Sequence, residues 1–487
     1  MINRLKNLAS DTAIYGVFTI VGRFLTFMLT PLYTNYLSIE EVGDIIFIFS
    51  LIAFLNIAYS FGMDSAFFRF YSKDEPERTR KVFSASYFTI LSISAVISII
   101  FLAFTESFSP AISDLPNANT LIRLAALIPL SDALMFIPYS YLRMTRQAKT
   151  FALAKFFLII VTVGLNFALV VFMSMGAEGV LLSQLIANVC GLVFFIPLIF
   201  KHLDFKIDFK LMREMFRYGL PTLPANFSAI ILQVADRPVL KALTDSTQLG
   251  LYGVNYRLGI PMMLMVTVFE YAWKPFYLTH YKDEDAKVLF KRVLTYFTLA
   301  CAFVFLAVGL FIEYAVQMPF IGGKLIDPEY WSGLGIIPII LVAYYFNGMF
   351  TNFAAGFHIE KKTDYLPLAV GAAAISNIGL NFFLIPYMGY WGSTWATLIA
   401  YAISAVVLYV FARKVYPMNY EWKRILLIAA FTGIIYYIAT WLTGDMHLWV
   451  SIGIRLIAIA VFVLLLYVSG FFTPREREMI MKLVRRR

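Results

Sequence analysis

The stretch TFALAKFFLIIVTVGLNFALVVFM, residues 150–173, decides the fold class. It is an apolar run rich in Phe, Leu, Val and Ala, and as a helix it is long enough to cross the ~30 Å hydrocarbon layer of a bilayer. A membrane β-strand would show about ten residues of alternating polar and apolar character. The stretch therefore predicts a transmembrane α-helix.

Comparable runs continue on both sides of this stretch over the 487 residues, of which 60% are hydrophobic and only 14% charged. Soluble domains carry about 25% charged residues, so a soluble fold is excluded. The pattern predicts an all-α polytopic membrane protein with fourteen transmembrane helices. These runs are residues 11–36, 42–66, 82–105, 117–140, 150–173, 178–200, 213–240, 247–271, 288–312, 331–353, 364–386, 390–412, 421–442 and 447–472.

Lys and Arg concentrate in alternate connections between the runs. The basic connections are residues 73–81, 143–149, 201–213, 274–292, 361–362 and 413–424, together with the tail 475–487. The other connections hold Asp and Glu against only Lys241 and Lys324. Because basic residues accumulate on the cytoplasmic side, this alternation predicts a multi-pass protein with both termini cytoplasmic. It also assigns the net charge of +10 to membrane orientation, so no nucleic-acid partner is expected.

An internal repeat divides the chain. The residues Lys149-Thr150, Gly164-Leu165-Asn166-Phe167 and Met175-Gly176 return as Lys362-Thr363, Gly379-Leu380-Asn381-Phe382 and Met388-Gly389. A weaker echo pairs the turn at Gly43 with Gly250. Repeats six helices apart share one orientation, which predicts two pseudo-symmetric six-helix lobes with a substrate path between them. The expected lobes are residues 1–210 and 211–417, followed by helices 13 and 14 with a basic tail in residues 418–487.

Five arginines fall inside the apolar runs: Arg23, Arg123, Arg237, Arg257 and Arg455. A charge at the bilayer centre costs about 2.5–3.5 kcal/mol on insertion scales, so such residues normally face the protein interior or a wet cavity. Arg23 and Arg257 lie near mid-depth and are the first candidates for substrate binding. Arg237 and Arg123, closer to the outer ends of their runs, are further candidates. Arg455, in a surplus helix, is a candidate for a lipid groove.

Three acids lie at depth, Asp132, Asp236 and Glu270, and are candidates for H⁺ or Na⁺ coupling or for ion pairs. Because they are fewer than the arginines, an interior that holds all of these residues stays positive, and we expect an anionic substrate. A structural alternative is an ion pair between Arg257 and Asp236, or hydrogen bonds between helices.

Enzyme signatures are absent from the sequence. Gly322-Gly323-Lys324 lacks the earlier glycine of a phosphate-binding loop, and no HExxH or GxSxG occurs. The two cysteines and four histidines are isolated, which leaves no disulfide, metal or cofactor spacing. We therefore expect no catalytic residues, no metal and no cofactor. A polytopic lipid-linked glycan transferase or ligase is the minor alternative.

Two groups of motifs resemble the bacterial oligosaccharide and polysaccharide flippases of the multidrug, oligosaccharidyl-lipid and polysaccharide exporter (MOP) superfamily. The first group is Tyr15-Gly16, Arg23, Pro31-Leu32-Tyr33-Thr34, Leu37-Ser38, Gly43 and Ala66-Phe67-Phe68-Arg69-Phe70-Tyr71. The second is Tyr218-Gly219-Leu220-Pro221, Asp236-Arg237 and Gly250-Leu251-Tyr252. The likeness extends over the whole chain.

This resemblance implies a protein of the bacterial cytoplasmic membrane that carries an undecaprenyl-diphosphate-linked oligosaccharide from the inner to the outer leaflet by alternating access. Cavity arginines would meet the diphosphate or acidic sugars, and the last two helices would form a lipid groove. The implied partners are this lipid-linked oligosaccharide and membrane lipids, with the protein as a monomer. Lipid II flippases and cation-coupled multidrug exporters of the same superfamily are the alternatives.

Overall fold

The computed structural model describes residues 22, 25, 27–112, 115, 117–206, 208–444 and 446–472. These residues are almost entirely helical, and their only strands are the two-residue antiparallel pair β1 (Pro319–Phe320) and β2 (Gly323–Lys324). The chain divides into two compact units. The first unit comprises residues 1–257, 319–333 and 367–403, and the second comprises residues 258–318, 334–366 and 404–487.

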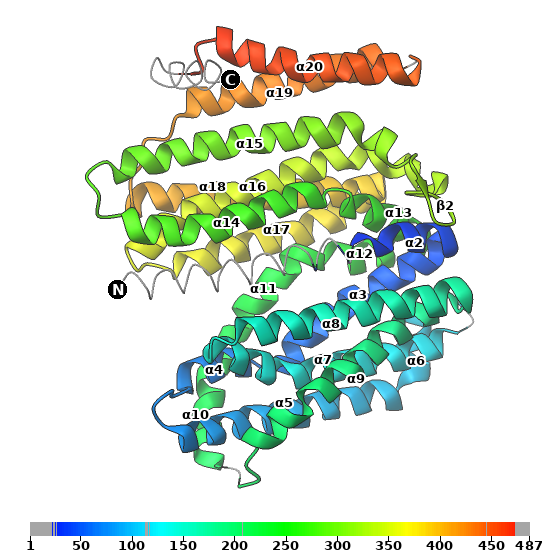
Figure 1. The fold of residues 1–487 in the computed structure, drawn as a ribbon, viewed down its shortest axis with the longest axis vertical. Helices are drawn as coiled ribbons and strands as arrows, with labels where there is room; N and C mark the ends of the chain where they lie inside the picture. Colours follow the sequence, from blue (N-terminus) through cyan, green and yellow to red (C-terminus); the bar gives the residue numbers. More distant parts are fainter. Residues whose placement is uncertain are drawn as a thin grey trace. The chain divides into compact units, whose positions relative to one another are not determined.

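The first unit is built mainly from the N-terminal helices (Figure 1). Up to residue 202 they are α2 (Leu29–Tyr36), α3 (Ile39–Ser60), α4 (Met63–Phe70), α5 (Pro76–Ala103), α6 (Thr105–Ile112), α7 (Ala118–Met144), α8 (Ala148–Asn166), the π-helix η1 (Phe167–Phe172) and α9 (Gly176–His202). Shorter helices follow: α10 (Phe209–Gly219), the 3₁₀ turn η2 (Leu220–Thr222), α11 (Leu223–Val234), α12 (Asp236–Leu243) and α13 (Ser246–Arg257).

The core of the first unit lies where α7 packs against α5 and α9. Phe83 of α5, Ile137 of α7 and Phe195 of α9 are almost completely buried there. Apolar side chains recur on these helices because each must cover its neighbours inside the unit, whereas Val193 of α9 points outward and is exposed. The packing leaves polar side chains of α7, α8 and α9 facing one another, and these side chains form the site described below.

Two equivalent contacts follow the internal repeat. Glu41, at the start of α3, accepts a hydrogen bond from the Ala177 backbone N–H at 3.1 Å. At the corresponding place in the second repeat, Gln248 of α13 accepts one from the Tyr390 N–H at 3.4 Å. The residues before Ala177 and Tyr390 are Gly176 and Gly389, whose φ angles are +57° and +56°. Glycine adopts this conformation without a steric penalty. The repeated sequence therefore produces a repeated local structure.

The second unit holds α14 (Ile260–His280), α15 (Ala286–Ala315), α16 (Ile337–Ile359), α19 (Trp422–Thr443) and α20 (Leu448–Val468). The 3₁₀ helix η3 (Pro328–Ile336), α17 (Tyr365–Met388) and α18 (Tyr390–Val415) each contribute residues to both units. Within the second unit α15, α19 and α20 lie side by side (Figure 1). Leu306, Ile428 and Phe462, one from each of these three helices, are fully buried between them.

Eleven helices of the described residues are long and apolar enough to cross a membrane. Each corresponds to one of the predicted runs, so a multi-pass helical membrane protein is confirmed, whereas the count of fourteen continuous helices is not. The run 11–36 lies mostly outside the described residues and ends in α2. The runs 213–240 and 247–271 are each divided into shorter helices.

Proline explains both divisions. Pro221 and Pro224 stand at the starts of η2 and α11, and Pro261 stands at the start of α14. Proline has no N–H to donate to the preceding turn but fits the first turn of a helix, so each residue favours a new helix start at its position. Hydropathy alone does not register this effect, because proline barely changes the mean of a long apolar window.

Candidate substrate cavity

A cavity of about 330 Å³ lies inside the first unit. Residues of α2, α3, α7, α8 and α9, together with the last residue of α13, form its wall. Its polar lining consists of Tyr33, Asp132, Tyr139, Lys155, Thr162, Asn166, Gln184, Asn188 and Arg257. A cavity with mostly apolar walls and a few placed polar groups is the usual form of a ligand site.

Arg257 is the last residue of α13 and is half-buried. Among the described residues it has no ion pair and no side-chain hydrogen bond. Its positive charge is repelled by that of Arg237. The Arg257 guanidinium therefore presents its donors to the cavity.

Buried amides hold the neutral part of the lining in place. Asn166 is fully buried, accepts a hydrogen bond from the Tyr33 hydroxyl at 2.9 Å, and donates to the Thr162 carbonyl at 2.8 Å. Asn188, also fully buried, accepts from Gln184 at 2.9 Å and donates to Ser131 Oγ at 3.2 Å. Because their hydrogen-bonding groups are used within the protein, these amides stabilise the wall of the cavity.

Lys155 and Asp132 are the other charged residues of the lining. The Lys155 Nζ lies 4.1 Å from the centroid of the Tyr139 ring, a cation–π contact. Asp132 accepts a hydrogen bond from Asn56 at 3.5 Å, and the described residues show no ion pair between Asp132 and Lys155. With Arg257, the lining carries two cations against one carboxylate, an excess of positive charge that attracts an anion.

Sequence reasoning selected Arg257 and Asp132 but not Lys155. A lysine inside the run 150–173 is itself a signal, because a charge within an apolar span is costly. Lys155 lies near the start of the run, six residues after Lys149 of a basic connection. It was therefore grouped with the basic residues that determine membrane orientation.

Arg237 and Asp236 lie together at the start of α12. Asp236 is buried and accepts hydrogen bonds from the Tyr252 hydroxyl and from the Arg237 backbone N–H. The Arg237 guanidinium lies 5.4 Å from the centroid of the Tyr256 ring. Asp236 is therefore held by α13, and the described residues contain no ion pair between it and Arg257.

The remaining candidates are not brought together with this cavity in the described residues. Arg123 is exposed on the first turns of α7, and Glu270 is exposed on α14 of the second unit. Arg23 lies outside the described residues. Within the described ranges no group of His, Cys, Asp and Glu could hold a metal ion.

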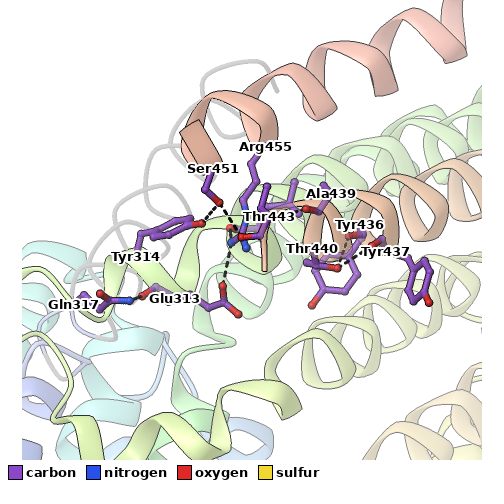
Figure 2. A network of polar contacts seen from close by, with 11 residues as sticks. Glu313, Tyr314, Gln317, Tyr436, Tyr437, Ala439, Thr440, Thr443, Ser451 and Arg455 are labelled. Carbon is purple, nitrogen blue, oxygen red and sulfur yellow. Dashed lines mark hydrogen bonds and ion pairs between the residues drawn. The ribbon is translucent and has the colours of Figure 1, made fainter. Parts of the chain in front are cut away.

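Arg455 of α20 is buried in the second unit (Figure 2). It donates from Nε to Thr443 Oγ1 at 2.9 Å and from Nη1 to the Leu310 carbonyl and to Glu313 at 3.1 Å. Its guanidinium also lies 4.7 Å from the centroid of the Tyr314 ring. One side chain of α20 thus binds the ends of α15 and α19.

The sequence matches the polysaccharide biosynthesis protein family over residues 8–277, more than half of the chain. Comparison with curated proteins gives no match. Among solved structures, the lipid II flippase MurJ in an inward closed conformation is similar at 18% identity and a TM-score of 0.72, over 94% of this chain and 100% of that one. A multidrug resistance MATE family transporter of the MOP superfamily is similar at 15% identity in two states. The inward-facing structure has a TM-score of 0.66 over 84% of this chain and 96% of that one, and the outward-facing structure 0.58 over 83% and 95%. These findings confirm the predicted family resemblance and show that the chain shares the fold of the MurJ and MATE structures.

Proposed function

The chain belongs to the polysaccharide biosynthesis protein family and has a MOP transporter fold, and we propose that it translocates an anionic undecaprenyl-diphosphate-linked oligosaccharide from the inner to the outer leaflet. Transport proceeds by alternating access through a positively charged cavity. The observation that carries this proposal is the Arg257 guanidinium, which faces the cavity without a carboxylate partner among the described residues.

A diphosphate that enters a cavity must exchange its hydration shell for hydrogen bonds from the protein. Arginine supplies a rigid fork of charged donors that fits phosphate oxygens, and lysine supplies a point charge. Arg257 and Lys155 offer one of each in the same cavity. Arg237, whose charge interacts with that of Arg257, would add to the attraction, and we assign Arg23 and Arg123 the same role along the path.

A lipid II flippase would use the same chemistry, because its substrate is also a lipid-linked diphosphate, so the cavity supports both substrates equally. A multidrug exporter for cations would need an excess of acids. In the cavity of the first unit the single carboxylate, Asp132, shares the lining with two cations, which disfavours a cationic substrate.

We place the protein in the bacterial cytoplasmic membrane with both termini cytoplasmic and fourteen crossings, of which the seventh and eighth are discontinuous. The lobes 1–210 and 211–417, the addition 418–487 and a monomeric state belong to the same proposal. The basic connections support the orientation, and the repeated contacts of Glu41 and Gln248 support the lobes.

Replacement of Arg257 tests the function. In Arg257→Ala we expect the loss of a charge-assisted hydrogen bond, roughly 1.5–3 kcal/mol, to weaken binding of the lipid-linked glycan about ten- to a hundredfold. Arg257→Lys should restore binding only in part, because the fork is missing. The measurement is translocation of the lipid-linked glycan to the outer leaflet, together with its binding to purified protein.

Arg413→Ala is the matched control, since Arg413 is exposed and does not line the Arg257 cavity. Detergent chromatography establishes that each variant is folded. A folded Arg257→Ala protein that binds and translocates the glycan lipid at the normal rate would refute the anionic cavity. Improved export of a cationic dye by the same variant would favour a drug exporter.

A further inference from the structure

Helix α10 of the first unit carries a basic groove on its exposed side. This α10 groove has a volume of about 530 Å³ and is lined by Lys210, Arg213, Glu214, Phe216, Arg217 and Leu220. It shares no residue with the first cavity, which contains Arg257. The function proposed above therefore makes no use of the groove.

The opposite side of α10 is fixed to the rest of the first unit. The helix packs against α4 and α5 (Figure 1). Met215 is fully buried in the core, and the Phe216 ring centroid lies 5.2 Å from that of Phe61. The 11 residues of α10 cover about 16 Å, half the hydrocarbon layer of a bilayer, so this helix cannot span a membrane.

The exposed side of α10 combines a basic stripe with an apolar one. Lys210, Arg213 and Arg217 are spaced three and four residues apart, so they lie along one side of the helix, and all three are exposed. Among the described residues none of the three forms an ion pair. Phe209 and Leu220, about three turns apart, lie beside this stripe and are 69% and 48% exposed. Such adjoining stripes are typical of a helix that lies in the membrane interface.

These side chains discriminate between possible ligands. A soluble anion would pair with the cations but would leave Phe209 and Leu220 in contact with water. The phosphate of a zwitterionic lipid carries its own cation, which is repelled by a groove that holds three cations against the single carboxylate of Glu214. An anionic phospholipid supplies phosphate oxygens for the arginine forks, and its acyl chains cover the apolar side chains.

We propose that the α10 groove binds an anionic phospholipid of the surrounding bilayer. Arg213 and Arg217 donate to the headgroup phosphate, and Lys210 adds a point charge. Phe209 and Leu220 enter the boundary between headgroups and acyl chains. Because the groove lies on the exposed side of α10, bilayer phospholipids reach it directly. This inference goes beyond the proposed function and holds whether or not the protein transports a glycan.

A fluorescent reporter on α10 tests the site. Tyr218 is 44% exposed on this helix. Tyr218→Cys, in a background where Cys190 and Cys301 are replaced by alanine, is labelled with an environment-sensitive fluorophore. Labelled protein is placed in nanodiscs of phosphatidylcholine that contain increasing fractions of phosphatidylglycerol. The midpoint of the change in emission measures the affinity for the anionic lipid.

The groove variant combines Lys210→Gln, Arg213→Gln and Arg217→Gln. We expect it to bind phosphatidylglycerol roughly tenfold more weakly or worse, because each basic residue near an anionic surface contributes about fivefold. The matched control changes the net charge equally at three exposed lysines of the second unit that do not line the groove. These lysines, each replaced by glutamine, are Lys361, Lys362 and Lys414. The control should bind phosphatidylglycerol within about twofold of wild-type protein.

Glu214→Gln provides a test that does not depend on a loss. It removes the only carboxylate of the groove lining, so we expect binding of phosphatidylglycerol to strengthen about two- to fivefold. A gain in affinity cannot come from a protein that has failed to fold. An unchanged or weaker affinity in folded Glu214→Gln protein would contradict the proposal.

Equal losses in the groove variant and the matched control, or no loss in either, would overturn the site. A groove variant that binds phosphatidylglycerol normally but loses the lipid-linked glycan would assign α10 to the transported substrate instead. Arg257→Ala should bind phosphatidylglycerol as wild-type protein does. A failure of the α10 groove and a failure of the proposed function are therefore distinguishable.

Discussion

Asp132 is the one carboxylate in the described lining of the first cavity, where it faces the same space as Lys155 and Arg257. Protonation of Asp132, or a cation bound to it, would remove one negative charge from a lining that already carries an excess positive charge. The affinity of the cavity for an anion would then rise. A single side chain could in this way couple a gradient of H⁺ or Na⁺ to substrate binding.

We expect Asp132→Asn to remove the dependence of translocation on an imposed pH or sodium gradient. Glu270→Gln should leave this dependence intact, because Glu270 is exposed on the second unit and has no ion pair or side-chain hydrogen bond among the described residues. The measurement is glycan-lipid translocation in proteoliposomes under each gradient. Gradient dependence that persists in both variants would eliminate a coupling role for these acids.

The same cavity shows which site residues can be predicted from the sequence and which cannot. Arg257 and Asp132 could be selected because a charge inside an apolar run is costly and therefore conspicuous. Asn166 and Asn188 carry no charge, so nothing in an apolar run distinguishes a cavity amide from one that bonds a neighbouring helix. Only the packing of α8 against α9 places both side chains in the wall of one cavity.

At the scale of elements, α3 and α13 approach more closely than side chains would allow. A Cβ added at Gly43 would lie 1.9 Å from the Ser246 carbonyl oxygen, and one at Gly250 would lie 2.4 Å from that of Ile39. Gly43 and Gly250 are also the two glycines that occupy equivalent positions in the internal repeat. Lys241 and Ser246 both donate hydrogen bonds to the buried Asp44, which fixes the start of α3 at the same contact.

Gly43→Ala should therefore force α3 and α13 apart and destabilise the protein by about 1–3 kcal/mol, the usual cost of overpacking. Gly164→Ala is the control, because a Cβ there meets no atom within 4 Å and alanine favours helix. Thermal unfolding in detergent, followed by tryptophan fluorescence, should show a lower midpoint for Gly43→Ala alone. Equal midpoints for the two variants would contradict the close approach.

Arg455 determines how α20 is attached. The Arg455 guanidinium donates to acceptors on α15 and α19 (Figure 2). We expect Arg455→Met to lose these hydrogen bonds, to reduce the free energy of unfolding by about 1–3 kcal/mol and so to lower the unfolding midpoint. Glu313→Gln should cost less, because the Glu313 side chain is 53% exposed and partly solvated. A lipid groove at Arg455 predicts the opposite result, weaker binding of the lipid-linked glycan at unchanged stability.

The elements themselves were largely predictable, for a physical reason. Hydropathy identifies the runs whose side chains favour lipid, such as 288–312 in α15. In lipid such a run must pair its backbone groups within itself, and it does so as a helix. The runs 213–240 and 247–271 were wrong as single helices because local backbone chemistry at proline divides them. The partners of a helix depend on surface shape, which hydropathy does not record.

At the scale of the whole molecule, the length of the helices and the charge of their connections together predict an orientation in the membrane. The 30 residues of α15 span about 45 Å, more than the ~30 Å hydrocarbon layer, so its two ends lie on opposite sides. At the first end, the Lys287 ammonium lies 4.9 Å from the centroid of the Tyr416 ring. Tyr416 belongs to the connection that also carries Arg413 and Lys414. The basic residues of two connections thus gather at one end of the second unit.

Single cysteines at Lys287 and Gln317 test this orientation in a background where Cys190 and Cys301 are replaced by alanine. Basic connections remain cytoplasmic, so we expect an impermeant thiol reagent to label Gln317→Cys on intact cells and Lys287→Cys only after lysis. Both side chains are exposed at the ends of α15, which makes their intrinsic reactivity comparable. Labelling of Lys287→Cys before lysis would invert the membrane arrangement. Export from the inner to the outer leaflet would then no longer follow from the basic connections.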